Sequence, residues 1–253
     1  QHGAMVELSR LIKRDIDPST AKFIIEPIAI NIDDVYNDTL GYGTFVMPAI
    51  IIIIIQQTLL MSIGIIGATN TPQKEIETLI TTDYSRFPIF ALLLGKIVTY
   101  FMVSGLVSTL ALTLPYYLFG YPMLGSVWAV VAVIVPYILT CTMLGIALST
   151  LFSHREEPIM WLLWSSIPVL MLSGVSYPTS AMPEPLVYLG ALFPSSHAVK
   201  AFLRVRDMGA TVSDVVLPIS ALWIQVILYG ALAALLLCRR VKKREVVHIY
   251  RTT

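Results

Sequence analysis

The sequence predicts an all-α polytopic membrane protein, and three observations support this fold class. Hydrophobic residues make up 56% of the 253-residue chain and charged residues only 13%, whereas a soluble domain carries about 25% charged residues. The mean hydropathy of the chain is +0.77. Several apolar runs without charge also reach the roughly 20 residues that a helix needs to cross a membrane.

Residues 1–43 have a soluble character, and we expect them to be the last part of a small α+β domain outside the cytoplasm. Residues 5–16 carry apolar side chains at helical spacing, which predicts an amphipathic helix. Residues 22–32 are typical of a β-strand, and Pro27 within them indicates a strand at the edge of a sheet.

Five apolar runs within residues 44–238 are predicted to form transmembrane helices. They are residues 44–68, 89–119, 126–152, 158–177 and 215–238. Residues 185–206 are also apolar, but prolines interrupt them and each part is too short to cross. We expect two re-entrant or interfacial helices there.

The distribution of Lys and Arg predicts the orientation of these helices. Segments 69–88 and 153–157 and the tail 239–253 hold most of the basic residues outside 1–43, and cytoplasmic loops carry an excess of Lys and Arg. We therefore expect these segments, including the basic C-terminal tail, in the cytoplasm and residues 1–43 on the opposite side. An outer domain without a cleaved leader needs a helix that carries it across. The five predicted spans are therefore expected to belong to a set of six, with the first span before residue 1.

A polar segment, residues 71–96, separates the first two predicted spans, and its first half has the features of a helix at the membrane surface. Thr71 can cap the helix, Pro72 suits its first turn, and acidic residues follow near the positive end of the helix dipole. Apolar residues then recur at helical spacing on one face. Two interpretations follow: a linker that rests on lipid, or a docking surface for a soluble motor protein. The candidate contacts with such a partner are Thr71, Glu75, Ile76, Glu77, Leu79, Ile80 and Arg86.

A group of polar residues lies in the middle of the first predicted span. Its members are Gln56, Gln57, Thr58 and Ser62. These side chains either hydrogen-bond neighbouring helices or line a path for a transported substrate. In the third predicted span, Gly145 and Ser149 have the small-residue spacing that predicts a close helix crossing.

The sequence gives little support for an enzyme. The histidines are scattered, so no catalytic or metal-binding constellation is visible, and Leu94-Gly95-Lys96 lacks the first glycine of a phosphate-binding loop. We therefore predict no catalytic residue, no metal and no cofactor in this chain. Charged residues are almost absent from the spans, which argues against an ion-coupled carrier. The absence of a basic stripe with interleaved aromatic residues argues against nucleic acid as a partner.

Three stretches resemble the membrane subunit of type-2 ATP-binding-cassette exporters, of the bacterial kind with a large outer domain between its first two spans. Residues 77–82 (ETLITT) followed by 92–96 (LLLGK) resemble the family pattern GTxExLLxTP…ELLLGK. Residues 172–204 resemble its LSGxxxP…MP…P…R stretch, and Tyr36-Asn37 resembles its YNP entry to a span. The likeness covers nearly the whole chain from Tyr36 onward.

The chain departs from the family pattern at several positions. Lys74-Glu75 replaces Gly-Thr, and both Asp83 and Asp38 replace proline. His197 stands where an aromatic residue is usual. Because Lys74 and Glu75 lie in the segment expected to meet the motor and Asp83 follows it directly, a weaker or differently paired contact is left open.

The resemblance implies the permease subunit of an ATP-driven exporter that moves drug-like, lipid or other amphipathic cargo across the bacterial inner membrane. Two such subunits, identical or different, would form the pathway in the bilayer. Separate ATPase subunits, which bind ATP and Mg²⁺, would dock on residues 71–82, and a periplasmic adaptor is a further expected partner. The helices of residues 178–206 would help to form an outer gate. The gate residues carried over by the resemblance are Ser173, Gly174, Pro178, Met182, Pro183 and Pro194.

The main alternative to an exporter is a membrane scaffold or assembly subunit of an ATPase complex that transports nothing itself. Stimulation of the partner ATPase by cargo distinguishes the two functions.

Overall fold

The computed structural model describes residues 42–69, 87–120, 124–177 and 179–252. All secondary structure in these ranges is helical and none of it is a strand, so the all-α fold class is confirmed for this part of the chain. The helix predicted at 5–16 and the strand predicted at 22–32 lie outside the described residues.

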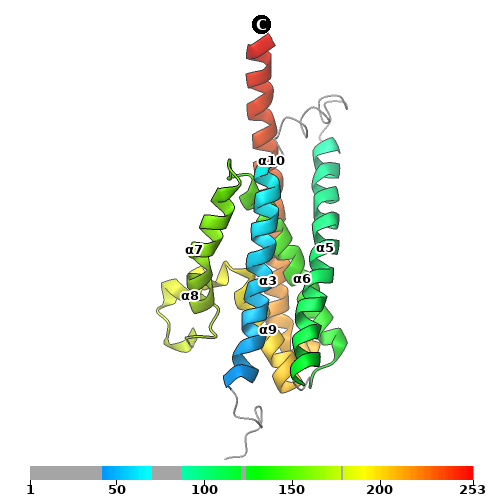
Figure 1. Ribbon diagram of the computed structural model, residues 1–253, viewed down its shortest axis with the longest axis vertical. Coiled ribbons are helices and arrows are strands. Elements are labelled where there is room, and N and C mark those ends of the chain that lie inside the picture. The colour runs from blue at the N-terminus through cyan, green and yellow to red at the C-terminus, as the bar shows by residue number, and fades with distance from the viewer. Residues whose placement is uncertain (1–41, 70–86, 121–123, 178, 253) are drawn as a thin grey trace, which may run out of the picture. The chain divides into compact units, whose positions relative to one another are not determined.

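The described residues form seven α-helices and two short 3₁₀ helices (Figure 1). The α-helices are α3 (Tyr42–Thr69), α5 (Phe87–Phe119), α6 (Val127–Ser149), α7 (Glu156–Leu172), α8 (Glu184–Ala191), α9 (Pro194–Met208) and α10 (Val216–Thr252). The 3₁₀ helices are η1 (Thr179–Ala181) and η2 (Val212–Val215).

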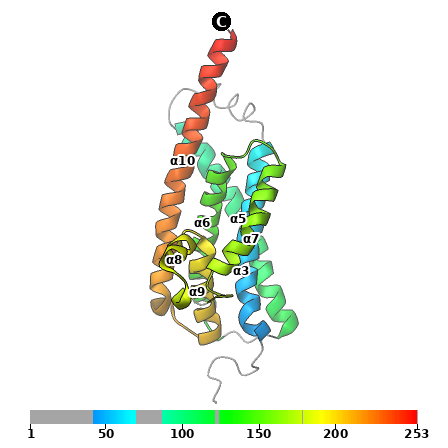
Figure 2. The same ribbon diagram turned by 90° about the vertical axis from the view of Figure 1, so that its left-hand side faces the viewer.

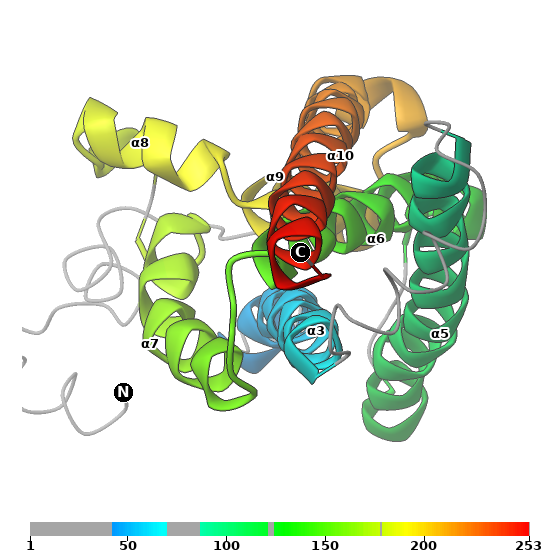
Figure 3. The same cartoon turned by 90° about the horizontal axis from the view of Figure 1, so that it is seen from above.

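Helices α6 and α9 pack against each other and against both α3 and α10, around a shared apolar core (Figures 1 and 2). Helix α3 contains six consecutive isoleucines and is apolar on all sides, a pattern that suits a buried or membrane-crossing helix. Helices α7 and α5 stand on opposite sides of α3 (Figures 1 and 3). Most large apolar side chains of α5 point away from the rest of the described chain, so lipid or another protein can cover them.

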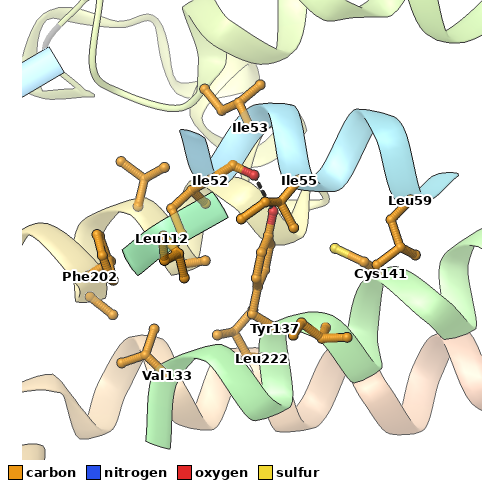
Figure 4. Close-up of a cluster of buried hydrophobic side chains, with 14 of the residues drawn as sticks. Ile52, Ile53, Ile55, Leu59, Leu112, Val133, Tyr137, Cys141, Phe202 and Leu222 are labelled. Carbon is orange, nitrogen blue, oxygen red and sulfur yellow. Dashed lines mark hydrogen bonds between the residues drawn. The ribbon is translucent and has the colours of Figure 1, made fainter. Parts of the chain in front are cut away.

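A buried tyrosine joins α6 to α3 inside this core (Figure 4). The Tyr137 side chain is fully buried, and its hydroxyl donates a hydrogen bond to the carbonyl oxygen of Ile52. On the same helix, the Thr140 hydroxyl donates to Pro136 O at 2.7 Å and lies 3.1 Å from Leu222 O of α10. Polar contacts of this kind hold membrane helices together where apolar burial alone gives no preference for protein over lipid.

Small residues allow α3 and α6 to approach closely, as the sequence predicts. A Cβ atom placed on Gly145 would lie 2.9 Å from Ile63 Cδ1. A Cβ atom on Gly67 would lie 2.5 Å from Ser149 Cβ. Since real Cβ atoms do not sit this close to other atoms, the crossing depends on glycine at both positions.

Four helical segments are long and apolar enough to cross a membrane within the described ranges. They are Val46–Ala68, Phe90–Phe119, Val127–Ser149 and Val212–Arg239. They correspond to four of the five predicted spans, and α8 with α9 adds a fifth only if that bent pair counts as one span. The chain is therefore a multi-pass membrane protein.

The predicted span at 158–177 is only partly helical. Helix α7 has 17 residues and ends at Leu172. Its length is therefore about 26 Å, which is at the lower limit for a helix that crosses a membrane. Beyond it, Gly174 adopts a φ of +86°, a conformation that favours glycine and ends the helix. The sequence pattern missed this stop because residues 173–177 carry no charge.

Candidate functional site

Helices α8 and α9 meet at a sharp corner, residues 191–195, where their axes differ by 88°. Pro194 is the first residue of α9, a position that tolerates proline because the N–H it lacks has no partner within the helix. The corner leaves the last carbonyls of α8 and the first N–H groups of α9 without partners in their own helices. Such groups are costly in apolar surroundings, so the residues that bond them show what holds the corner in place.

Helix α3 bonds the start of α9 through one glutamine. The backbone N–H of Ser195 donates to Gln56 Oε1 at 2.8 Å, and both residues are fully buried. Gln56 lies near the middle of the candidate span Val46–Ala68. The contact joins positions 139 residues apart, so it is purely tertiary.

Helix α10 bonds the end of α8 through two side chains on one face. Gln225 Nε2 donates to Ala191 O at 2.7 Å, and the Tyr229 hydroxyl, one turn further along, donates to Leu192 O. The ring of His197 on α9 also approaches Ala191 O, with Nε2 at 3.0 Å. The carbonyls at the corner are therefore bonded by α10 and by α9 itself.

The end of α7 also packs against α8 and α9. A Cβ atom on Gly190 would lie 2.9 Å from Leu172 O, so α8 passes close to the last turn of α7. The Ser196 hydroxyl lies 3.5 Å from the same carbonyl. Three helices from different parts of the chain thus surround the corner (Figure 2).

The corner lies at about half the length of the helices that hold it. Gln225 is near the middle of Val212–Arg239, as Gln56 is near the middle of its own span. A backbone break halfway along membrane helices is tolerated where protein or a water-filled cavity surrounds it. Broken helices of this kind build the binding sites and gates of many transporters.

Three polar atoms at the corner are buried without a hydrogen-bond partner among the described residues. They are Gln56 Nε2, Ser195 Oγ and Gln225 Oε1. Each belongs to a side chain or residue that already uses another atom to bond the corner. These three atoms can therefore donate or accept further hydrogen bonds.

The structure separates the predicted pathway residues onto different faces of α3. Gln56 faces the interior, whereas Thr58 and Ser62 lie on the exposed face and donate to carbonyls of their own helix. Gln57 is half-buried, and neither polar atom of its amide has a partner within the described part of the chain. The bond from Ser195 N to Gln56 is the kind of contact that the helix–helix interpretation expects. A path lining stays a prediction for Gln56, Gln57, Thr58 and Ser62.

Most predicted gate residues lie in the connection from α7 to α9. Ser173 is buried and its hydroxyl donates to Leu170 O, and Gly174 makes the turn that follows. Pro183 caps α8, and Met182 is half-buried beside it. Pro178 lies outside the described residues.

All the predicted motor-contact residues lie outside the described ranges, which resume at Phe87. The turn between α6 and α7, also predicted to be cytoplasmic, is described. There the Glu157 carboxylate accepts from Ser153 N and lies 2.8 Å from His154 Nδ1. The hydrogen bond to Glu157 raises the pKa of His154, and the same bond lowers the pKa of Glu157.

No group of three or more His, Cys, Asp or Glu side chains within the described ranges could hold a metal ion. The cysteines Cys141 and Cys238 are both free. The chemistry of the described site is therefore that of neutral hydrogen-bonding groups at a helix break.

Sequence reasoning missed Gln225 and Tyr229. Gln225 is an amide in the middle of an apolar run, and an amide in that setting is also what drew attention to Gln56 within its polar group. Applied to every span, that criterion would have found it. Tyr229 gave no such indication, because tyrosine is common in membrane helices for other reasons.

Comparisons with known proteins give a consistent picture. The family model described as "ABC-2 family transporter protein" matches residues 4–235. Two curated relatives, each named "Probable multidrug ABC transporter permease YbhR", from Escherichia coli strain K12 and from Escherichia coli O157:H7, are 25% identical over 162 residues. That alignment covers 64% of this chain and 43% of either relative, so the chain spans less than half the length of these proteins. No solved structure matches.

Proposed function

This chain belongs to the ABC-2 family of transporter proteins, and from that premise we propose that it is the permease subunit of an ATP-driven exporter for drug-like, lipid or other amphipathic cargo. The observation that carries the proposal is the α8–α9 corner, a helix break held halfway along two candidate spans by side chains from both. Transporters use broken helices at this depth to bind or to block their cargo. The relatives named as multidrug permeases support the cargo class.

The pathway in this proposal runs along the exposed face of α3. Thr58 and Ser62 form a polar strip on that face, and their hydroxyls are already bonded to α3 carbonyls. Such a strip offers weak polar contacts without holding a cargo tightly. A second permease subunit, identical or different, faces this strip and closes the pathway from the other side.

The energy for export comes from ATP hydrolysis by separate ATPase subunits on the cytoplasmic side. Residues 71–82 meet these subunits, and α3, which ends at Thr69, carries the movement into the membrane. ATP and Mg²⁺ bind on the partner. The protein lies in the bacterial inner membrane with its C-terminus in the cytoplasm, since the Lys and Arg residues favour that side.

Blocking the α3 face is the test of this function. The full-length protein is reconstituted with its co-purifying ATPase in inside-out proteoliposomes, and ATP-dependent uptake of ethidium, a lipophilic cationic dye, is measured. We expect Thr58→Phe to reduce uptake about tenfold or more, because an aromatic ring fills the path. Thr109→Phe is the matched control: Thr109 is an exposed threonine on α5 whose hydroxyl also bonds the carbonyl four residues back.

Equal uptake by the Thr58→Phe and Thr109→Phe proteins would show that the α3 face does not line the path. If the wild-type complex hydrolyses ATP but neither dye nor lipid stimulates hydrolysis or moves, the chain is a scaffold subunit and the exporter proposal is wrong.

A further inference from the structure

The corner between α8 and α9 bonds only part of its backbone locally, for example through Phe193 N to Gly190 O and Ser196 N to Phe193 O. The N–H of Ser195 and the carbonyls of Ala191 and Leu192 are bonded by side chains of α3 and α10. These two helices lie far apart in the sequence and each reaches the corner near its own midpoint. The geometry of the corner therefore depends on the distance between α3 and α10.

We propose that Gln56, Gln225 and Tyr229 form a latch that keeps the corner closed to water while α3 and α10 stay at their present separation. This inference rests on the proposed function, and on the outer gate that the resemblance implies for residues 178–206, which include the corner. Gln56 is a positioning residue in the latch, because it acts on the gate through Ser195.

The latch is asymmetric, and the asymmetry identifies the bond that breaks first. Helix α10 holds the corner through two side chains, and His197 supports one of the same carbonyls. Helix α3 holds it through the single bond from Ser195 N to Gln56. When α3 moves relative to α10, the corner stays with α10 and the Gln56 bond opens.

Water stabilises the open latch. The closed corner contains three buried polar atoms with no partner among the described residues: Gln56 Nε2, Ser195 Oγ and Gln225 Oε1. Polar groups of this kind are costly in a dry interior, and an entering water molecule can bond several of them at once. The closed state therefore has the direct bond from Ser195 N to Gln56 together with unsatisfied atoms, whereas the open state loses that bond and lets water reach those atoms. This balance leaves two states close in free energy, which a moving α3 can interconvert.

The test measures water at the corner without any transport assay. A single cysteine, Phe193→Cys, is placed at the corner of the full-length protein in a background with Cys141→Ala and Cys238→Ala. Its reaction rate with a hydrophilic maleimide is measured in lipid nanodiscs. We expect Gln56→Met to raise that rate about fivefold, the change that corresponds to losing one hydrogen bond of roughly 1 kcal/mol.

Gln57→Met is the matched control, because it removes the neighbouring amide of the same span, which makes no bond to the corner in this structure. Its labelling rate should equal that of the parent. Tyr229→Phe removes a single hydroxyl and keeps the ring, so it tests the latch even if Gln56→Met does not fold. We expect it to raise labelling as well.

Equal labelling rates in the parent, Gln56→Met and Tyr229→Phe proteins would overturn the latch. Equal acceleration by Gln56→Met and Gln57→Met would overturn it too, since the effect would then come from any lost amide. Because labelling needs neither ATP nor cargo, the outcomes are separable. A latch can be found in a protein that exports nothing, and an exporter can be found without a latch.

Discussion

Gly125 is a single residue on which the packing at the start of α6 depends. It lies in the turn before α6, beside the last turn of α9, and a Cβ atom there would lie 2.1 Å from Val205 O. The neighbouring Leu124 N–H donates to Arg206 O at 3.0 Å. The turn and α9 are thus in direct backbone contact, and no side chain fits between them.

Gly125→Ala should destabilise the protein because the new methyl group must push these two backbones apart. Overpacking of this kind costs about 1–3 kcal/mol, which lowers the melting temperature of a chain of this size by roughly 2–12 °C. The measurement is thermal unfolding in detergent by intrinsic fluorescence. Gly105→Ala on α5 is the control, since nothing lies within 4 Å of the added Cβ; a matching loss of stability there would mean that the contact with Val205 is not the cause.

The sequence can point to an individual functional residue only where that residue is of a type unusual for its segment, such as an amide in an apolar helix. Gln56 stands out because an amide is costly inside a membrane helix, and the structure indeed gives it a buried partner. That partner is a backbone N–H, and every residue except proline has one. No sequence pattern could therefore have identified Ser195 as the group that Gln56 binds.

At the scale of elements, the segment at 71–82 is the one that we expect to transmit force. If its apolar stripe fills a groove on the ATPase, Leu79→Asp should weaken binding of the motor by roughly 10–150-fold, because a buried leucine contributes about 1.5–3 kcal/mol. Glu77→Gln should weaken it by no more than about fivefold, as expected for an exposed ion pair. Pull-down of the ATPase and cargo-stimulated ATP hydrolysis measure both variants.

The comparison of these two variants is informative because the family pattern has an acidic residue at the position of Glu77. A larger loss from Glu77→Gln than from Leu79→Asp would show that charge, rather than apolar packing, carries the contact. Wild-type binding by a correctly folded Leu79→Asp protein would leave 71–82 as a linker on the membrane surface.

Most helices could be predicted from the sequence, but their ends and bends could not. Three long apolar runs appear as helices within a few residues of the predicted limits, and the fourth, α10, starts at Val216, next to the predicted start at residue 215, but continues to Thr252, past the predicted limit of residue 238. Length and composition alone decide whether a segment suits a membrane. Helix α7 ends five residues early, since a glycine conformation rather than hydropathy stops it. The 88° corner depends on bonds from α3 and α10 that only the folded chain brings together.

At the scale of the whole molecule, the prediction that remains is the orientation in the membrane. Single cysteines are introduced by Ser19→Cys, Thr81→Cys and Thr252→Cys in a background without the native cysteines. An impermeant thiol reagent applied to spheroplasts should label the first and spare the other two. All three should react after the membrane is permeabilised, which controls for accessibility.

Labelling of the Thr81→Cys protein from outside intact spheroplasts would reverse the assignment and would place 71–82 where no ATPase can reach it. The orientation prediction relies on the positions of Lys and Arg, which the helices do not reveal. Composition alone was enough to identify a membrane protein. The arrangement of α3, α6, α9 and α10 around one core, by contrast, could not be predicted, because apolar residues on all sides of a helix do not show which side meets protein and which meets lipid.

The latch contains only neutral groups: two amides, a phenol and backbone atoms. A unit charge that crosses a membrane gains or loses about 2.3 kcal/mol for each 100 mV of potential. Forming or breaking the bonds of Gln56, Gln225 and Tyr229 moves no unit charge, so it performs almost no electrical work. The corner should therefore stay shut equally well in an energised and in a de-energised cell. A seal of this kind should respond to force on α3 rather than to voltage.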